Sequence, residues 1–179
     1  EIYEIDREAF ADLDPYQNYD EFKNFISDNN MSTYAVKDSN GNIIGYYNLE
    51  PVRNGDLYID SIGLKPQYRN SRKGYAAIRQ AWDNITEYAK SNNAGTMSLH
   101  VDKENPKLKR MYEQFGFEVK ETYDTYYDNG NGAYYMEYVI PNDVIEISES
   151  SVPTQVTDDT FPVVDENSQE DVHPNQILA

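Results

Sequence analysis

The sequence contains no cysteine, which excludes disulfides, thiolate-bound metals and a cysteine nucleophile. Histidine is almost as scarce: the chain has His100 and His173, which lie far apart, so we expect no histidine-based metal site. A run of about 18 apolar residues is also missing, and we expect no membrane span. The opening Glu-Ile-Tyr-Glu lacks the charged and then apolar pattern of a secretory signal. These absences together favour a soluble, cytoplasmic protein.

Basic residues are few. The 179 residues include 15 Lys and Arg against 32 Asp and Glu, which gives a formal net charge of −17. An acidic protein repels phosphate backbones, so we expect no nucleic-acid partner. The same charge attracts cationic substrates such as amines. An acidic surface also serves solubility alone, and both interpretations stay open.

The acidity is concentrated toward the C-terminal end. Residues 141–179 hold nine of the acidic residues and none of the basic ones, and they include Pro153, Pro162 and Pro174. Few apolar residues remain there to form a core, which is typical of disordered segments. We therefore expect one folded domain over residues 1–140. Residues 141–179 are expected to form an acidic, extended tail that lies on the domain or on a partner.

Hydrophobic periodicity and turn residues predict the order of elements in residues 1–140. Apolar residues at spacings of three and four predict a long helix over residues 74–92. Asn105 and Pro106 predict the start of a later helix and Gly116 its end. One or two short helices are expected between residues 9 and 31. Strands are expected at residues 1–5, 32–37, 43–52, 56–64, 97–101, 117–123 and 133–140. This order predicts a mixed α/β domain with one twisted sheet.

A basic turn joins the predicted strand at residues 56–64 to the long helix. It carries Arg69, Arg72, Lys73 and Gly74 in a chain that is otherwise short of positive charge. The first turn of a helix presents unpaired N–H groups and the positive end of the helix dipole, which together bind phosphate. Gly74 lets a ligand approach the backbone closely. The turn therefore predicts a phosphate-binding site, although a purely structural turn has the same general appearance.

The same stretch resembles the coenzyme-binding loop of the GNAT family of N-acetyltransferases. Ile62, Leu64, Pro66, Tyr68 and Arg69 match the first part of that motif, and the Gly-Tyr-Ala at residues 74–76 matches its end. The middle is two residues longer than the family form, with Ser71 in place of Gln or Arg. The resemblance implies a mostly antiparallel twisted sheet with helices on both faces, and acetyl-CoA as cofactor. It implies coenzyme contacts from Ile62, Gly63, Leu64, Arg69, Arg72, Lys73, Gly74, Tyr75 and Ala76.

A second match to the family begins at Asn105. Asn105 and Tyr112 lie seven residues apart, almost two helical turns, so they share one face of the predicted helix. Gly116 and Phe117 follow at the family's spacing. The resemblance implies that Asn105 contacts the pantetheine arm of the coenzyme and that Tyr112 protonates the departing thiolate. Asn105 also has a structural interpretation, as the N-cap of its helix.

Acetyl transfer to an amine requires the amine to be uncharged. An alkylamine has a pKa of about 10.4, so a base must accept a proton. Glu50 and Asp60, on strands of the predicted sheet, are the predicted bases, and His100 is a further candidate. Without a cysteine nucleophile, direct attack by the amine is favoured.

Two functions remain open at this point. The first is an acetyl-CoA-dependent N-acetyltransferase whose acceptor is a small cationic amine, a peptide N-terminus or a lysine. The second is a binding or assembly module with the same fold and weak or no catalysis, which binds a protein partner or forms a homodimer through the tail.

Overall fold

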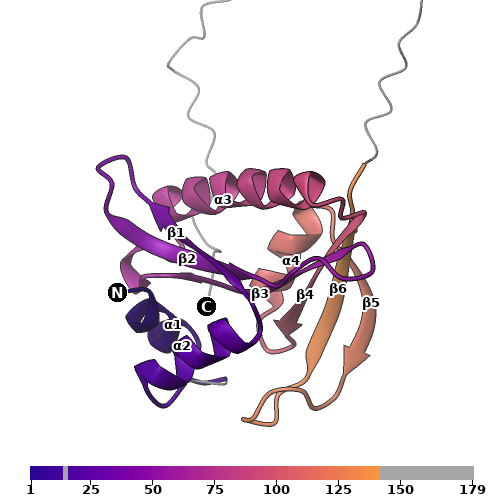
Figure 1. Ribbon diagram of the computed structural model, residues 1–179. Helices are drawn as coiled ribbons and strands as arrows, with labels where there is room; N and C mark the ends of the chain where they lie inside the picture. The colour runs from indigo at the N-terminus through magenta and orange to yellow at the C-terminus, as the bar shows by residue number, and fades with distance from the viewer. Residues whose placement is uncertain (14–15, 142–179) are drawn as a thin grey trace, which may run out of the picture. The chain divides into compact units, whose positions relative to one another are not determined.

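The computed structural model describes residues 1–13 and 16–141, which form a six-stranded sheet with helices on both faces (Figure 1). The predicted acidic tail lies, from residue 142 onward, outside the described residues. The strand order is β1-β2-β3-β4-β6-β5. The elements are α1 (Ile2–Ala9), α2 (Tyr19–Asp28), β1 (Ser32–Lys37), β2 (Ile43–Leu49), β3 (Asp56–Leu64), η1 (Pro66–Tyr68), α3 (Arg72–Ser91), β4 (Thr96–Asp102), α4 (Pro106–Gln114), β5 (Glu118–Tyr123) and β6 (Ala133–Val139).

The expected strand at residues 1–5 is wrong, because these residues begin helix α1. Ile5 and Ala9 are buried four residues apart on one face of α1, and Asp6 is buried beside them. The same few residues also alternate in polarity, and so short a window does not separate a period of two from a period of 3.6. Helix α1 packs against β2 and β3, and this tertiary contact stabilises the helical choice. The other predicted strands are all found, with ends that shift by a few residues.

Helices α3 and α4 lie on one face of the sheet, and α1 and α2 lie on the other (Figure 1). Helix α3 buries the apolar stripe that its spacing predicts: Ile78, Ala81, Trp82, Ile85 and Ala89. It begins two residues before the predicted start because Ser71 is its N-cap, and the Ser71 hydroxyl accepts a hydrogen bond from the Gly74 N–H at 3.0 Å. In the described part of the chain, no helix combines the length and apolar character needed to span a bilayer.

The sheet opens between its two central strands. β3 and β4 pair in parallel over three positions, from Asp56 opposite Thr96 to Tyr58 opposite Ser98. Every other neighbouring pair of strands is antiparallel. Beyond Tyr58, β3 continues its pairing with β2 as far as Leu64. The edge of β3 that faces β4 is therefore available for another partner over its second half.

A β-bulge lies in β3 at the start of this opening. Asn48 of β2 pairs with Ser61, whereas the next residue, Leu49, pairs with Ile59. Asp60 is the extra residue of the bulge. A bulge places two successive side chains on nearly the same face of the strand and bends the strand locally. The bulge thus turns both Asp60 and Ser61 toward the side of the sheet that carries α1 and α2, where both residues line one cavity.

Candidate functional site

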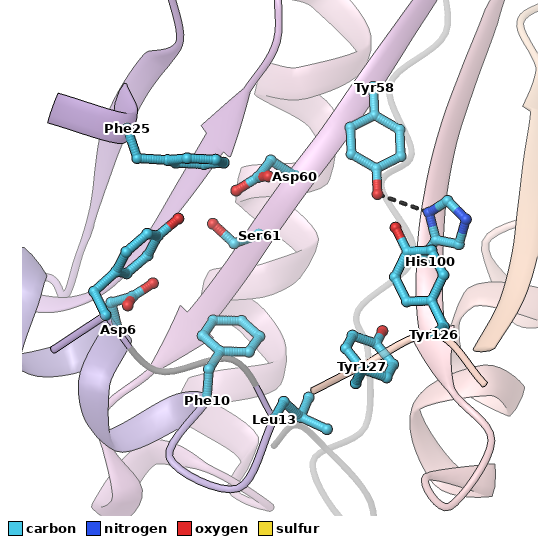
Figure 2. A pocket seen from close by; sticks show the side chains of 11 residues that line it. Asp6, Phe10, Leu13, Phe25, Tyr58, Asp60, Ser61, His100, Tyr126 and Tyr127 are labelled. Carbon is cyan, nitrogen blue, oxygen red and sulfur yellow. Dashed lines mark hydrogen bonds between the residues drawn. The ribbon is translucent and has the colours of Figure 1, made fainter. Parts of the chain in front are cut away.

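A cavity of about 300 Å³, which we call the acceptor cavity, lies where β3 and β4 separate (Figure 2). Its walls come from helix α1 and the segment that follows it, from α2, from β3 and β4, and from the connection between β5 and β6. Most of the wall is aromatic, and the polar groups are few. The lining residues are Asp6, Phe10, Leu13, Tyr16, Phe25, Tyr58, Asp60, Ser61, His100, Tyr126 and Tyr127.

Asp60 is the predicted base that the structure brings to this cavity. Burial raises the pKa of Asp60 to about 6, and the nearby negative charges of Glu50 and Asp6 add to the increase. Glu50 follows the end of β2 and is half-buried, and its backbone N–H donates to the Tyr58 carbonyl at 3.0 Å. Glu50 therefore lies within electrostatic reach of Asp60, although it is not one of the cavity-lining residues.

A second carboxyl group reaches the cavity from α1. Asp6 is 2% exposed, and its Oδ2 accepts a hydrogen bond from the hydroxyl of Tyr46. Its Oδ1 is buried and has no hydrogen-bond partner among the described residues. Burial raises the pKa of Asp6 to about 6, against the opposing effect of the Tyr46 hydroxyl. Asp6 is not among the site residues predicted from the sequence. In a helix, Asp6 would have been recognised as an acidic residue on the apolar face. The expected strand at residues 1–5 did not allow this recognition.

His100 and Tyr58 face each other across the opening. The Tyr58 hydroxyl lies 2.7 Å from Nδ1 of His100, and both residues line the cavity (Figure 2). The imidazole stacks on the ring of Tyr126 with centroids 4.2 Å apart. Tyr123 and Tyr135 pack around it at 5.7 and 5.2 Å. Burial lowers the pKa of His100 because the charged form is the less well solvated one.

The basic turn, residues 69–76, lies at the other end of β3, and we call it the donor turn. Arg69 is folded back against the strand, where its Nε donates to the Leu64 carbonyl at 2.8 Å. Its Nη2 is buried and unpaired among the residues described. The side chains of Arg72, Lys73, Tyr75 and Ala76 are exposed on the first turn of α3. The two exposed cations, Arg72 and Lys73, at the N-terminus of a 20-residue helix suit a pyrophosphate.

Gly74 has a structural reason to be glycine. A Cβ at this position would lie 2.0 Å from the carbonyl oxygen of Tyr68. The close approach that requires a glycine here is that of the η1 backbone. The coenzyme contact expected at Gly74 stays a prediction. Gly74 holds the donor turn closed against the helix, and its N–H is already bonded to Ser71.

Asn105 is the N-cap of α4, which follows β4, and Tyr112 lies within α4. The Oδ1 of Asn105 accepts from the Leu108 N–H at 3.0 Å, so the N-cap interpretation of Asn105 is confirmed. Tyr112 is 6% exposed and packs in the core, with its ring edge-on to Phe117 at 5.5 Å. Burial raises the pKa of the Tyr112 phenol and keeps it protonated. Tyr112 belongs to the core rather than to the lining of the acceptor cavity.

The family model described as the Acetyltransferase (GNAT) family matches residues 1–117. The chain belongs to this family. Membership of the family gives the activity class, which is acetyl transfer to an amine, and the donor, which is acetyl-CoA. Both were predicted from the sequence. None of the curated proteins matches the sequence.

Three solved structures illustrate the fold. Spermidine N-acetyltransferase from Vibrio cholerae, in complex with CoA and spermine, has a TM-score of 0.64 at 22% identity and covers 78% of this chain and 88% of its own. Ribosomal-protein-S18-alanine N-acetyltransferase from Escherichia coli has a TM-score of 0.63 at 20% identity, covering 81% and 89%. Nourseothricin acetyltransferase has a TM-score of 0.55 at 25% identity, covering 64% and 68%. The predicted fold class, a mostly antiparallel GNAT-like sheet with helices on both faces, is confirmed.

Proposed function

We propose that this GNAT member acetylates a small cationic amine that enters the acceptor cavity. The observation that carries this proposal is the pair of carboxyl groups, Asp6 and Asp60, on the cavity wall. An ammonium gains more from such groups in a partly desolvated cavity than it would in bulk water. The aromatic lining adds cation–π attraction and apolar contact for the rest of the molecule.

The size of the cavity also favours a small acceptor. Its volume of about 300 Å³ is at the lower end of the usual range for ligand pockets, roughly 300–1,000 Å³. A linear amine, a single lysine side chain or a peptide N-terminus suits this space better than a folded protein surface. The relative from Vibrio cholerae was solved with spermine, a linear polyamine, which supports placing polyamines first among the acceptors to test.

The donor side of the proposal rests on the free edge of β3 and on the donor turn. We expect the pantetheine arm to pair with backbone groups of the segment Ile62, Gly63 and Leu64, where the Leu64 carbonyl already accepts from Arg69. The Asn105 amide nitrogen is a second proposed contact for it. Arg72 and Lys73, with Tyr75 and Ala76 beside them, hold the pyrophosphate at the start of α3. Arg69 reaches it only if its guanidinium, whose Nη2 is buried, turns outward. Bound there, acetyl-CoA supplies the acetyl thioester.

Proton transfers complete the proposal. Tyr112 holds a proton on its hydroxyl for the departing sulfur, because burial keeps the phenol protonated at neutral pH. The sequence offers three candidate acceptors for the proton that the ammonium loses, which are Glu50, Asp60 and His100. Asp60 and His100 line the cavity, so these two are the candidates that lie beside a bound amine.

A coupled thiol-release assay tests the proposal with a panel of spermidine, glucosamine, a lysine ester and a peptide with a free N-terminus. We expect turnover of spermidine to exceed that of glucosamine, because the cavity wall offers carboxylates and rings in place of a polar network for hydroxyl groups. We also expect KM for the cationic acceptors to rise with ionic strength, because salt screens the attraction. Absence of turnover with the whole panel would contradict the proposal.

The second candidate is a binding or assembly module. It is favoured because the Arg69 guanidinium already donates to the Leu64 carbonyl, so part of it is unavailable to a coenzyme. Isothermal titration with acetyl-CoA separates the two candidates, since no binding at millimolar coenzyme would remove the enzyme proposal. Several expectations from the sequence remain predictions. They are the domain boundary at residue 140, a tail that binds a protein partner or joins two copies, the cytoplasmic location and the lack of nucleic-acid or membrane partners. Light scattering of the full chain and of a chain ending at Ile140 tests the role of the tail in self-association.

A further inference from the structure

The opening of the sheet is bridged by one pair of side chains. Tyr58 lies on β3 at the last position that pairs with β4, where its partner is Ser98. His100 lies on β4 two residues beyond Ser98. Backbone pairing has ended there, yet the Tyr58 hydroxyl and the His100 Nδ1 are 2.7 Å apart. Both side chains also line the acceptor cavity beside Asp60 (Figure 2). An amine in this cavity is therefore bordered by both Tyr58 and Asp60.

We propose that the Tyr58–His100 pair is the route by which the acceptor ammonium loses its proton. The Tyr58 oxygen accepts a proton from the ammonium as its own hydroxyl proton passes to Nδ1 of His100. One N–H bond breaks at the amine and one forms at the imidazole, while Tyr58 loses one O–H proton and gains another. The products are a neutral amine and an imidazolium, so the charge balances. This inference rests on the proposed function and names a proton acceptor for it.

The state of His100 suits this role. Because burial holds the pKa of His100 below its ordinary value, the imidazole is neutral at pH 7 and its Nδ1 can accept. The side chain is only half-buried, so the imidazolium can return its proton to solvent. The titratable groups that face His100 or its partner are Tyr58 and Asp60 of β3, Glu121 and Tyr123 of β5, Tyr135 of β6, and Tyr126 and Tyr127 of the β5–β6 connection. Glu121 favours the protonated form, and the surrounding rings stabilise a transient cation.

The carboxyl groups of the cavity suit a different task. A carboxylate beside an ammonium stabilises the charged amine and so opposes its deprotonation. Asp6 is also buried, and its Oδ2 is held by Tyr46. Asp6 and Asp60 thus hold the ammonium form, and the neutral pair of Tyr58 and His100 removes the proton.

The test compares His100→Gln and Tyr58→Phe with Asp60→Asn, using the panel amine that the wild-type chain acetylates fastest. We expect His100→Gln to lower kcat/KM at pH 7 by about 10²–10⁴-fold, with most of the loss in kcat. The loss should shrink as pH rises toward about 10.4, where the free amine itself becomes abundant. Imidazole in the buffer should restore part of the activity. Tyr58→Phe should show the same recovery at high pH, whereas Tyr88→Phe on α3 should behave as wild type.

Asp60→Asn distinguishes the two candidate bases. The wild-type kcat/KM should fall as pH drops through the pKa of His100, and Asp60→Asn should raise KM while keeping that fall. The proposal is overturned if His100→Gln keeps wild-type rates, if its loss is the same at every pH, or if Asp60→Asn abolishes the fall at low pH. Titration of acetyl-CoA into each variant checks that the donor side is intact. A wild-type chain that acetylates no amine would instead overturn the proposed function, and this inference with it.

Discussion

The donor turn and the acceptor cavity solve different physical problems. The donor turn is one continuous segment, residues 69–76, whose cations Arg72 and Lys73 stay in water and whose shape is set by contacts a few residues apart. The acceptor cavity brings Asp6, Asp60 and His100 together from three elements far apart in the chain and removes them partly from water. Changes in the donor turn should therefore act through local geometry. Changes in the cavity should act through proton equilibria.

The largest expected effect concerns Tyr112, which belongs to neither region. Tyr112→Phe removes the proposed acid and should lower kcat by about 10²–10⁴-fold while leaving the affinity for acetyl-CoA unchanged. The reason is that the phenol, whose pKa burial raises, would donate its proton only to the departing sulfur. Steady-state kinetics and isothermal titration measure the two quantities. Unchanged turnover in Tyr112→Phe would remove the acid role and leave the fold assignment intact.

The next prediction tests whether the stability of the folded chain depends on pH through Asp6. Burial raises the pKa of Asp6 in the folded chain to about 6, whereas an unfolded aspartate has a pKa of about 3.9. The folded state therefore binds this proton more tightly. Its contribution to stability is fully present below pH of about 3.9 and is lost as pH rises through about 6.

Asp6→Asn removes this penalty, and its amide oxygen can still accept from Tyr46. Relative to wild type, the free energy of unfolding of the variant should increase by roughly 1–3 kcal/mol between pH 4.5 and pH 7.5. Urea denaturation at the two pH values measures it. Asp83→Asn, on the exposed side of α3, is the control for a change of charge. If both variants show the same pH dependence, Asp6 is not the source of the coupling.

The third prediction tests the local character of the donor turn. Gly74→Ala places a Cβ 2.0 Å from the Tyr68 carbonyl oxygen, which is part of the backbone and has little freedom to move. We expect a loss of about 1–3 kcal/mol in the free energy of unfolding. This exceeds the gain of about 1 kcal/mol that alanine brings inside a helix. Coenzyme affinity should fall as well, because the turn must shift.

Gly95→Ala is the matched control, because its Cβ would meet its nearest neighbour at 3.9 Å. Thermal unfolding of both variants, together with titration of acetyl-CoA, measures the difference. Equal stabilities for the two variants would contradict the close packing of Gly74 against η1.

The same contrast explains what could be predicted from the sequence. The strand at Asp56–Leu64, the long helix and the Asn105 cap were right because each depends on neighbours a few residues away. The family motif carried the donor side for the same reason. The bulge at Asp60 was not predictable, because it is a property of the register between β2 and β3.

Asp60 and His100 of the acceptor cavity were named as candidate bases, but their meeting with Asp6 and Tyr58 was not predicted, because these groups come together only after folding. Tyr58 and His100 are 42 residues apart in sequence, and their contact depends on a three-residue parallel pairing that periodicity does not reveal. Asp6 was not predicted as a site residue because residues 1–5 were wrongly assigned to a strand. A buried carboxyl group contradicts the average behaviour of its residue type, so composition alone does not find it.

The smallest expected effect separates the two roles of Asn105. Its Oδ1 caps α4 by accepting from Leu108, and its amide nitrogen is a proposed contact for the coenzyme. Asn105→Ala removes both and should cost about 1 kcal/mol of folding stability. Asn105→Ser keeps an oxygen that can cap the helix, so its stability should stay within a few tenths of a kcal/mol of wild type. Chemical denaturation measures this part.

Coenzyme titration of the same two variants completes the argument. If the amide nitrogen contacts the coenzyme, both variants should bind acetyl-CoA more weakly than wild type, since serine has no N–H to offer at that distance. If serine binds as well as asparagine, the capping oxygen alone accounts for Asn105. The pantetheine arm would then be held by backbone groups alone, and the donor-side recognition by side chains would be confined to Arg72 and Lys73 of the donor turn.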